Sequence, residues 1–309
     1  MSRDWRDVDG ILLLDKPEGL SSNAALQRVR RAFRARKAGH TGSLDPLASG
    51  LLPVCFGQAT KASGLLLDAD KTYRVRIALG SRTATGDREG AVVETAPVPV
   101  LSEEGVRMIA SGFLGPSTQV PPMYSALKHQ GERLYRLARQ GIEVERPARA
   151  VTIHRLELQN RGPDWLDFEV VCSKGTYVRS LAEDIARASG TVGHVVSLRR
   201  TELGPFRNPA MKSLEAIETA AEDPESLDAM LLPADSALPG LAAVRLDAAG
   251  QAFVLRGQAV ETAGPGDARV RMYGVDGLFL GVGRMNADGH RLAPERIMVD
   301  VSSGPATRA

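Results

Sequence analysis

The residues with the clearest chemical potential lie in one glycine-rich segment, residues 39–50, with the sequence GHTGSLDPLASG. Its three glycines allow the backbone to approach a ligand closely. Pro46 disfavours a helical conformation at Asp45, so we expect this carboxylate to stand in an extended loop. A carboxylate held in a rigid loop can act as a nucleophile or as a general base. An aspartate that caps a turn explains these residues at least as well.

Other kinds of catalytic site have little support in the sequence. The phosphate-binding pattern GxxxxGK[ST] is absent, and the pair Gly281 and Gly283 lacks the third glycine of a dinucleotide-binding motif. Ser43 and Ser49 do not stand in the GxSxG motif of serine hydrolases. The five histidines are too scattered for the usual spacing of metal ligands. We therefore expect neither a metal nor an organic cofactor.

The length and composition are those of an ordinary globular protein. The 309 residues exceed one average domain, so we expect two compact units. No apolar stretch is long enough to cross a membrane, and residues 1–10 are too polar for a signal peptide. Cys55 and Cys172 stand in apolar runs, which predicts buried thiols in a reducing compartment. Together these features favour a cytoplasmic protein that does not contact membranes.

The formal net charge of +2 conceals a strong separation of charge along the chain. Residues 27–37 carry cations and no acid, whereas residues 213–230 carry acids and no cation. A second segment, residues 128–149, is also rich in lysine and arginine. One charged run is often only the solvated face of a helix. Two basic runs near glycine-rich loops nevertheless favour a surface that binds a polyanion.

Strands and helices alternate irregularly along the chain, which predicts an α+β domain with a mixed or antiparallel sheet. Apolar patterns and turn residues place the elements as follows. We expect strands at 11–15, 72–80, 150–159 and 165–172, and helices from Ser21–Asn23 to about 36, at 103–114, at 131–140 and from Thr176 onward. A composition change at 228–245 separates this part from short strand-like pieces, which predict a small β-rich C-terminal domain.

Six blocks of sequence, in order, resemble a known family. They are DKPEGLSSN, GHTGSLDPLASGLLPVCFGQATK, DKTYRVRIALG, PPMYSALKHQGERLYRLARQGIEV, SKGTYVRSLAEDI and HVVSLRRTELG, and they extend from residue 15 to residue 204. This series is similar to the TruB-type family of bacterial tRNA pseudouridine synthases. The resemblance implies a catalytic domain over 11–230 with an RNA-binding insertion at about 121–149. It also implies a PUA-like RNA-binding domain over 240–301, between a polar tail at 1–10 and a frayed tail at 302–309.

The resemblance implies a cofactor-free isomerisation of the uridine at position 55 in the T-loop of tRNA. The base would be flipped out, and its glycosidic bond broken and re-formed through another atom of the ring. The carboxylate could either attack the sugar or base, or move a proton at the sugar. The resemblance implies tRNA as the partner, and we expect a monomer without protein partners. Two alternatives stay open: an RNA-binding or tRNA-folding module with dispensable catalysis, and a related synthase that acts on rRNA.

The same resemblance assigns roles to residues of the catalytic blocks. Asp45 matches the catalytic aspartate, and Arg179 matches an arginine that pairs with this carboxylate. Tyr73 matches a tyrosine that lies against the flipped uracil, and a strand tyrosine half buried in the sheet is the alternative to this role. Tyr177 matches an active-site aromatic residue, and Leu198 matches an apolar wall residue that core packing explains equally well.

Further matches concern the binding of RNA. Lys16 matches a lysine near the site whose role could be purely structural, and His40 matches the histidine that fills the space of the extruded base. On its own, a histidine in a glycine-rich loop would more simply bond to the backbone. The cations expected to contact phosphates are Lys128, Arg133, Arg136 and Arg139 of the insertion, together with Arg34 of the first basic segment.

Overall fold

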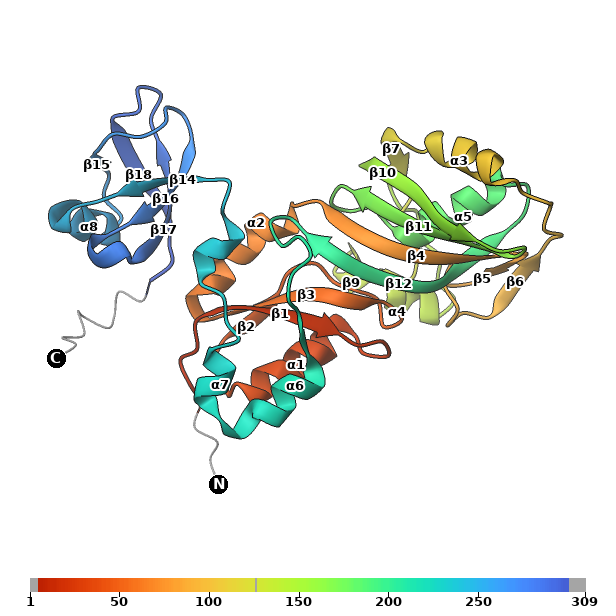
Figure 1. The fold of residues 1–309 in the computed structure, drawn as a ribbon, viewed down its shortest axis with the longest axis horizontal. Helices are drawn as coiled ribbons and strands as arrows, with labels where there is room; N and C mark the ends of the chain where they lie inside the picture. Colours follow the sequence, from red (N-terminus) through yellow and green to blue (C-terminus); the bar gives the residue numbers. More distant parts are fainter. Residues whose placement is uncertain (1–4, 126, 300–309) are drawn as a thin grey trace.

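A computed structural model describes residues 5–125 and 127–299 of the chain. Its largest element is a mixed sheet with the strand order β13-β1-β3-β12-β4-β11-β10-β7 (Figure 1). Strand β2 lies outside this order and pairs antiparallel with β3. The strands of this sheet are β1 (Gly10–Lys16), β2 (Ala38–His40), β3 (Ser49–Phe56), β4 (Lys71–Leu79), β7 (Gly115–Gln119), β10 (Arg149–Arg161), β11 (Trp165–Cys172), β12 (Gly193–Leu203) and β13 (Lys212–Ser213). The predicted α+β class with a mixed sheet is confirmed.

The remaining elements pack on this sheet or form smaller sheets beside it. The short strands are β5 (Ser81–Thr83) with β6 (Val92–Thr95), and β8 (Lys128–His129) with β9 (Glu132–Arg133). The helices of the catalytic part are α1 (Ser22–Ala32), α2 (Ser63–Leu67), α3 (Glu103–Ser111), α4 (Leu134–Arg139), α5 (Val178–Ala188), α6 (Leu214–Thr219) and α7 (Pro224–Asp228), with 3-10 turns η1 (Gly57–Ala62), η2 (Ala220–Glu222) and η3 (Ala234–Ala237).

A separate sheet forms near the C-terminus, with the order β14-β16-β17-β18-β15. Its elements are β14 (Ala242–Arg245), α8 (Ala248–Leu255), β15 (Val260–Glu261), β16 (Arg269–Tyr273), η4 (Val275–Gly277), β17 (Phe279–Met285) and β18 (Arg291–Ile297). It has its own apolar core, which includes Val254, Val270 and Leu280. Val282 and Met298 belong instead to a core shared with β1 and β3, so the two sheets pack together.

Alternating side chains divide the large sheet into two faces. On β4, Tyr73, Val75 and Ile77 are buried, whereas Arg74 and Arg76 between them are exposed. The buried face packs on α1, α3, α5 and α6, which all contribute to one large core. The other face is covered by the C-terminal part only at the β1–β3 end. Half of the sheet therefore has one face packed and one face open.

Helix α1 is shorter than its sequence predicts. Ser21 caps its first turn by accepting a hydrogen bond from the Ala24 amide, as expected. The helix ends at Ala32 rather than near residue 36, because Arg34 adopts a left-handed conformation with φ +50°. The Ala35 amide then donates to the Arg30 carbonyl, which closes a Schellman motif. Glycine usually occupies the position of Arg34, so the sequence carried no stop signal.

Several other expectations need correction at their boundaries. The predicted helix at 131–140 covers only Leu134–Arg139, because the β8–β9 hairpin precedes it. The helix expected from Thr176 begins at Val178. Residues 5–10, expected to lie in a polar tail, pack on the fold, since Val8 is buried in the main core. The tail expected at 302–309 lies outside the described residues.

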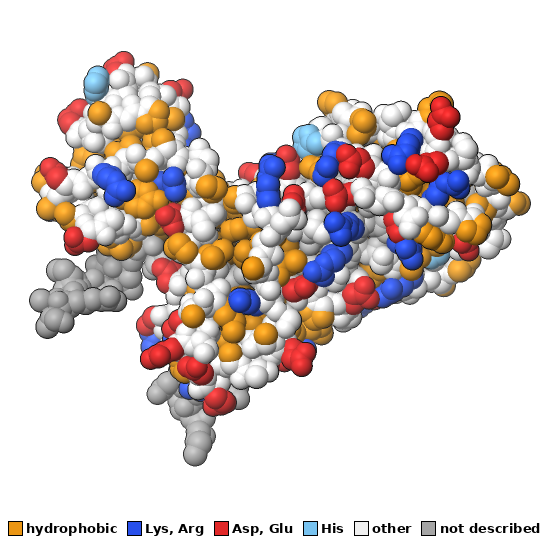
Figure 2. Space-filling model, in the orientation of Figure 1, with side chains coloured by type: hydrophobic (Ala, Val, Ile, Leu, Met, Phe, Trp, Pro, Cys, Tyr) orange, Lys and Arg blue, Asp and Glu red, His pale blue; other side chains and the backbone are white. Residues whose placement is uncertain are grey.

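The acidic segment 213–230 forms α6 and α7, which lie beside α1. Red side chains gather over these helices at the lower end of the molecule in Figure 2. Glu218 of α6 forms a two-point ion pair with Arg28 of α1, at 2.7 and 2.5 Å. Arg6 pairs with Asp228 in the same region. The acidic segment therefore neutralises part of the first basic segment.

No helix in residues 5–125 and 127–299 has the length and apolar character needed to cross a membrane.

Candidate active site

The loop that carries Asp45 connects β2 to β3 and is tied to two neighbouring segments. The Ser22 hydroxyl, in the first turn of α1, donates to the Leu44 carbonyl at 3.0 Å and accepts from the Leu44 amide at 2.7 Å. The Pro46 carbonyl accepts a hydrogen bond from the Gly19 amide at 2.8 Å. The residues on both sides of Asp45 are therefore fixed, which limits the positions that its carboxylate can take.

Arg179 of α5 holds the Asp45 carboxylate from one side. Its Nε lies 2.9 Å from Oδ2 of Asp45, and its Nη1 lies 3.6 Å from Oδ2 of Asp87. The guanidinium also donates to the carbonyls of Thr85 and Tyr124, each at 2.7 Å. The Arg179 side chain is only 4% exposed, whereas the Asp45 side chain is 39% exposed. A reactant can therefore approach Asp45 while Arg179 stays in place.

Burial raises the pKa of Asp45 above its ordinary value of 3.8, and Arg179 opposes this rise. The negative charge of Asp87 also raises the pKa of Asp45. A carboxylate with a raised pKa is a stronger base than a free one once it is ionised. An ionised carboxylate in this setting can accept a proton or act as a nucleophile.

The structure brings several of the predicted residues around this carboxylate. Burial is the main cause of a raised pKa at Tyr73 and Tyr177, and the charge of Asp45 adds to it in both cases. Tyr73 is 8% exposed, so it is more deeply buried than the half-buried strand tyrosine of the alternative interpretation. Leu198 is also buried and faces Val75, two residues from Tyr73 on the same side of the sheet.

Tyr177 lies immediately before α5 and is held by a residue that the sequence did not reveal. Its backbone amide donates to Oε1 of Gln119 at 3.0 Å, and its carbonyl accepts from Nε2 of Gln119 at 3.4 Å. Gln119 is the last residue of β7 and is buried. The side chain of Tyr177 does not cap the helix, so Gln119 fixes the backbone of the residue that precedes the helix carrying Arg179.

Lys16 and His40 occupy the edges of this region. Lys16 is fully buried, and its Nζ donates to the carbonyls of Pro17 at 2.8 Å and Leu20 at 2.6 Å. Burial lowers the pKa of Lys16 to about 8, although Asp45 opposes the shift. Burial also lowers the pKa of His40, and its Nδ1 has no hydrogen-bond partner within the described part of the chain. The backbone-bonding alternative for His40 therefore finds no support at Nδ1.

The cations of the two basic segments differ in their surroundings. Lys128, Arg133, Arg136 and Arg139 of the insertion are exposed, and none forms an ion pair with a described acidic residue. Arg139 lies over the ring of Tyr135, 5.7 Å from its centre. Arg34, by contrast, lies 3.9 Å from Glu222. The insertion therefore presents uncompensated positive charge, whereas α1 presents charge that α6 and its neighbours partly cancel.

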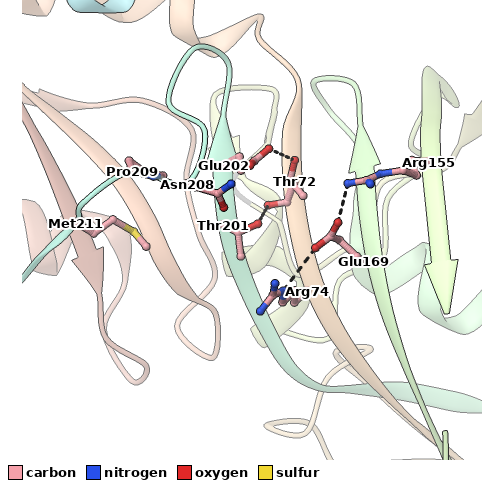
Figure 3. Close-up of a pocket in the computed structure, with 9 residues that line it drawn as sticks. All are labelled: Thr72, Arg74, Arg155, Glu169, Thr201, Glu202, Asn208, Pro209 and Met211. Carbon is pink, nitrogen blue, oxygen red and sulfur yellow. Dashed lines mark hydrogen bonds and ion pairs between the residues drawn. The ribbon is translucent and has the colours of Figure 1, made fainter. Parts of the chain in front are cut away.

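The reverse face of the sheet contains a polar cavity of about 480 Å³ (Figure 3). Arg74 and Arg155 both contact Glu169 there, at 3.5 and 2.6 Å. The strand alternation places Arg74 opposite to Tyr73, so this cavity is on the other side of the sheet from the Asp45 site. Positive and negative side chains are interleaved over this face in Figure 2, which leaves little net charge for binding a polyanion.

The two cysteines take no part in the site. Cys55 and Cys172 are free and fully buried, as predicted. Burial raises the pKa of Cys55 to about 12 and that of Cys172 to about 11. Both thiols are therefore protonated at neutral pH, which makes them poor nucleophiles.

The fold is similar to that of solved structures that contain Cbf5. The structure matches that entitled "Crystal Structure of a Cbf5-Nop10-Gar1 Complex" with a TM-score of 0.71 and 24% identity, over 97% of this chain and 91% of the other. It matches "Crystal structure of the archaeal box H/ACA sRNP Nop10-Cbf5 complex" with a TM-score of 0.70 and 22% identity, over 95% and 87%. At these identities the likeness establishes the shared fold.

Models of protein families match three consecutive parts of the chain. Residues 30–178 match "TruB family pseudouridylate synthase (N terminal domain)", residues 179–239 match "tRNA pseudouridylate synthase B C-terminal domain", and residues 242–298 match "Pseudouridine synthase II TruB, C-terminal". The protein named tRNA pseudouridine synthase B of Nitrosococcus oceani is 54% identical over 96% of this chain and 97% of its own length. The protein of that name from Burkholderia mallei is 51% identical over 95% and 98%.

These matches and the mixed sheet define the class of the protein as a pseudouridine synthase, an isomerase, with a PUA-like C-terminal β domain. The chain belongs to the TruB family of pseudouridylate synthases. The resemblance inferred from the six sequence blocks is thereby confirmed.

Proposed function

We propose that this chain converts the uridine at position 55 in the T-loop of tRNA to pseudouridine, with Asp45 as the catalytic residue. The observation that carries the proposal is the Asp45–Arg179 pair, in which the carboxylate is held at 2.9 Å and remains partly open to solvent. The family assignment supports the reaction, and the relatives named as acting on tRNA support the substrate. The alignments cover 96% and 95% of this chain and 97% and 98% of these relatives.

The reaction needs no oxidant or group donor. The bond between C1′ and N1 breaks, the uracil turns, and a bond between C1′ and C5 forms; C5 loses a proton and N1 gains one. Asp45 can serve this sequence by attacking the nucleotide or by moving a proton at the sugar. Arg179 keeps the carboxylate directed and opposes the effect of burial on its pKa.

The surrounding side chains suit an extruded base. We propose that Tyr73 lies against the flipped uracil and that Leu198 and Tyr177 complete the walls of its site. Their burial or half-burial beside Asp45 supports this proposal. A lowered pKa keeps His40 neutral at neutral pH, so it can enter a stack of bases without carrying a charge. We propose that His40 fills the space the base leaves and that Lys16 supports the nearby backbone.

The insertion supplies the surface for the RNA backbone. We propose that its four exposed cations, Lys128, Arg133, Arg136 and Arg139, bind phosphates of the T-arm, because no described acid compensates them. Arg34 stays a proposed phosphate ligand, although Glu222 at 3.9 Å competes for it.

We also propose the division into a catalytic domain over 11–230, with its insertion at about 121–149, and an RNA-binding domain over 240–301. The separate apolar core around Val254 and Val270 supports the second unit. A monomer acting in the cytoplasm fits this proposal, because substrate binding is assigned to surfaces of one chain.

Mapping of modified nucleosides in a T-arm transcript tests the function. The purified chain should form pseudouridine at position 55 and none in a transcript with cytidine at that position. Tight binding without product would favour an RNA-folding module instead. Product in an rRNA fragment but none in the T-arm would favour a synthase with another target.

A further inference from the structure

Arg200 of β12 is a buried cation whose presence the proposed reaction does not explain. It is 1% exposed, and no carboxylate of residues 5–125 or 127–299 forms an ion pair with it. A buried guanidinium without an acid partner is unfavourable unless backbone groups satisfy its donors. Its neighbour Arg199 points to the other face of the strand and pairs with Asp15 at 2.9 and 2.8 Å. The two arginines of β12 thus have opposite environments.

Two hydrogen bonds of Arg200 go to the two ends of the segment that carries Asp45. Its Nε donates to the Leu51 carbonyl at 2.7 Å, and its Nη2 donates to the Gly42 carbonyl at 3.0 Å. The residues between these carbonyls, 43–50, include the whole turn around Asp45. One planar guanidinium therefore bridges the entry and the exit of the loop.

The loop also lies close against the rest of the side chain. A methyl group at Gly42 would stand 3.3 Å from Nη1 of Arg200, and Gly42 has φ +69°, a conformation that other residues rarely adopt. Arg200 faces Tyr73 directly across the β12–β4 pair. Directly opposed residues of neighbouring strands place their side chains on the same face, so Arg200 stands between Tyr73 and the loop.

The other supports of the loop do not duplicate these contacts. Ser22 holds Leu44, and Gly19 holds Pro46, so both act at the middle of the segment. Arg200 acts at its ends and joins them to the strand that carries Leu198. Loss of the bridge would leave the middle tethered while the ends gain freedom, which would tilt the Asp45 carboxylate relative to Arg179.

We propose that Arg200 is a positioning residue, which fixes both ends of the 43–50 loop against β12 and thereby holds Asp45 in its reactive position beside Arg179. The inference rests on the proposed function, since it concerns the same carboxylate. Lysine cannot replace Arg200 in this role, because its ammonium is a compact point charge that lacks the rigid fork joining the two carbonyls.

The test compares Arg200→Lys with Arg199→Lys, the same substitution on the adjacent residue of the other face. Steady-state kinetics on a T-arm transcript give kcat and KM separately. Arg200→Lys should lower kcat on the order of 100-fold, the effect of a displacement of about 1 Å at a reacting group, with KM unchanged. Arg199→Lys should keep both values close to those of the wild type. Thermal unfolding of both variants shows whether each is folded at the assay temperature.

Gly42→Ala provides a second variant in case Arg200→Lys does not fold. It disturbs the same contact from the loop side and leaves the guanidinium in place, so it should also lower kcat without raising KM. If the wild type is active and a folded variant has an unchanged kcat, or is altered only in KM, this inference is wrong and the proposed function stands. A wild type that forms no pseudouridine overturns the proposed function and this inference with it.

Discussion

The insertion and α1 allow a matched comparison of two basic surfaces. Arg136 is exposed and has no ion pair with a described acid, whereas Arg28 forms a two-point pair with Glu218. Arg136→Ala should therefore remove a contact to tRNA, and Arg28→Ala should remove an internal contact. Both changes delete one positive charge, so net charge alone predicts the same result for both.

The expected change in the salt dependence of tRNA binding follows from counterion release. Each phosphate contact contributes about 0.9 to the slope of log affinity against log salt for a duplex. Loss of one contact should therefore flatten the slope by about 0.9, so the advantage of the wild type over Arg136→Ala should shrink about 3-fold between 50 and 200 mM salt. Arg28→Ala should leave this slope unchanged and lower the stability of the fold by about 1 kcal/mol or less.

Filter binding of a labelled T-arm transcript over a salt series measures both slopes. Equal slopes for Arg136→Ala and the wild type would remove Arg136 from the interface. An equal flattening in both variants would show that the overall charge of the protein, and not the insertion, attracts the RNA.

Two further predictions concern ionisation. Asp45 must be ionised to react and burial raises its pKa, so kcat should fall on acidification with an apparent pKa above 3.8. A pH–rate profile that stays flat down to pH 3.8 would contradict this expectation. Burial raises the pKa of Cys55 to about 12 and that of Cys172 to about 11. Iodoacetamide should therefore modify neither thiol in the native protein at pH 7, and both thiols after unfolding. Labelling of the native protein, detected by mass spectrometry, would show that the thiols are not buried.

The sequence predicted those elements whose pattern is uninterrupted. The alternation around Tyr73 and the turn between residues 159 and 165 located their strands to within a few residues. Strand β12 was not predicted. Register shifts between Val195 and Ser197 and between Arg200 and Glu202 break its alternation, so a simple period of two residues does not appear.

The residues of the candidate site that stand in sequence motifs could be predicted, whereas those that only folding brings to the site could not. Asp45 and Arg179 stand in distinctive sequence blocks. Asp87 and Gln119 lie in unremarkable stretches, and their proximity to α5 depends on the folding of β5–β6 and β7 against the helix. The ion pair of the first basic segment was hidden for a related reason, since Glu218 is 190 residues away from its partner Arg28.

If the Asp45 carboxylate carries the reaction, the variant Asp45→Asn should be inactive although it is folded. Because the pKa of Asp45 is raised, ionised Asp45 opposes folding near neutral pH. Protonated Asp45 stabilises the fold at low pH, and this stabilisation is lost as the pH rises through the pKa of Asp45 in the folded protein. Arg179 keeps Asp87 and two carbonyls as partners, so the variant should unfold at the same temperature as the wild type or above it.

Quantification of pseudouridine in a T-arm transcript, at enzyme concentrations that saturate the RNA, is the decisive measurement. We expect complete conversion of position 55 by the wild type and no product from folded, tRNA-binding Asp45→Asn. Pseudouridine formed by the variant at the rate of the wild type would show that Asp45 is not the catalytic residue.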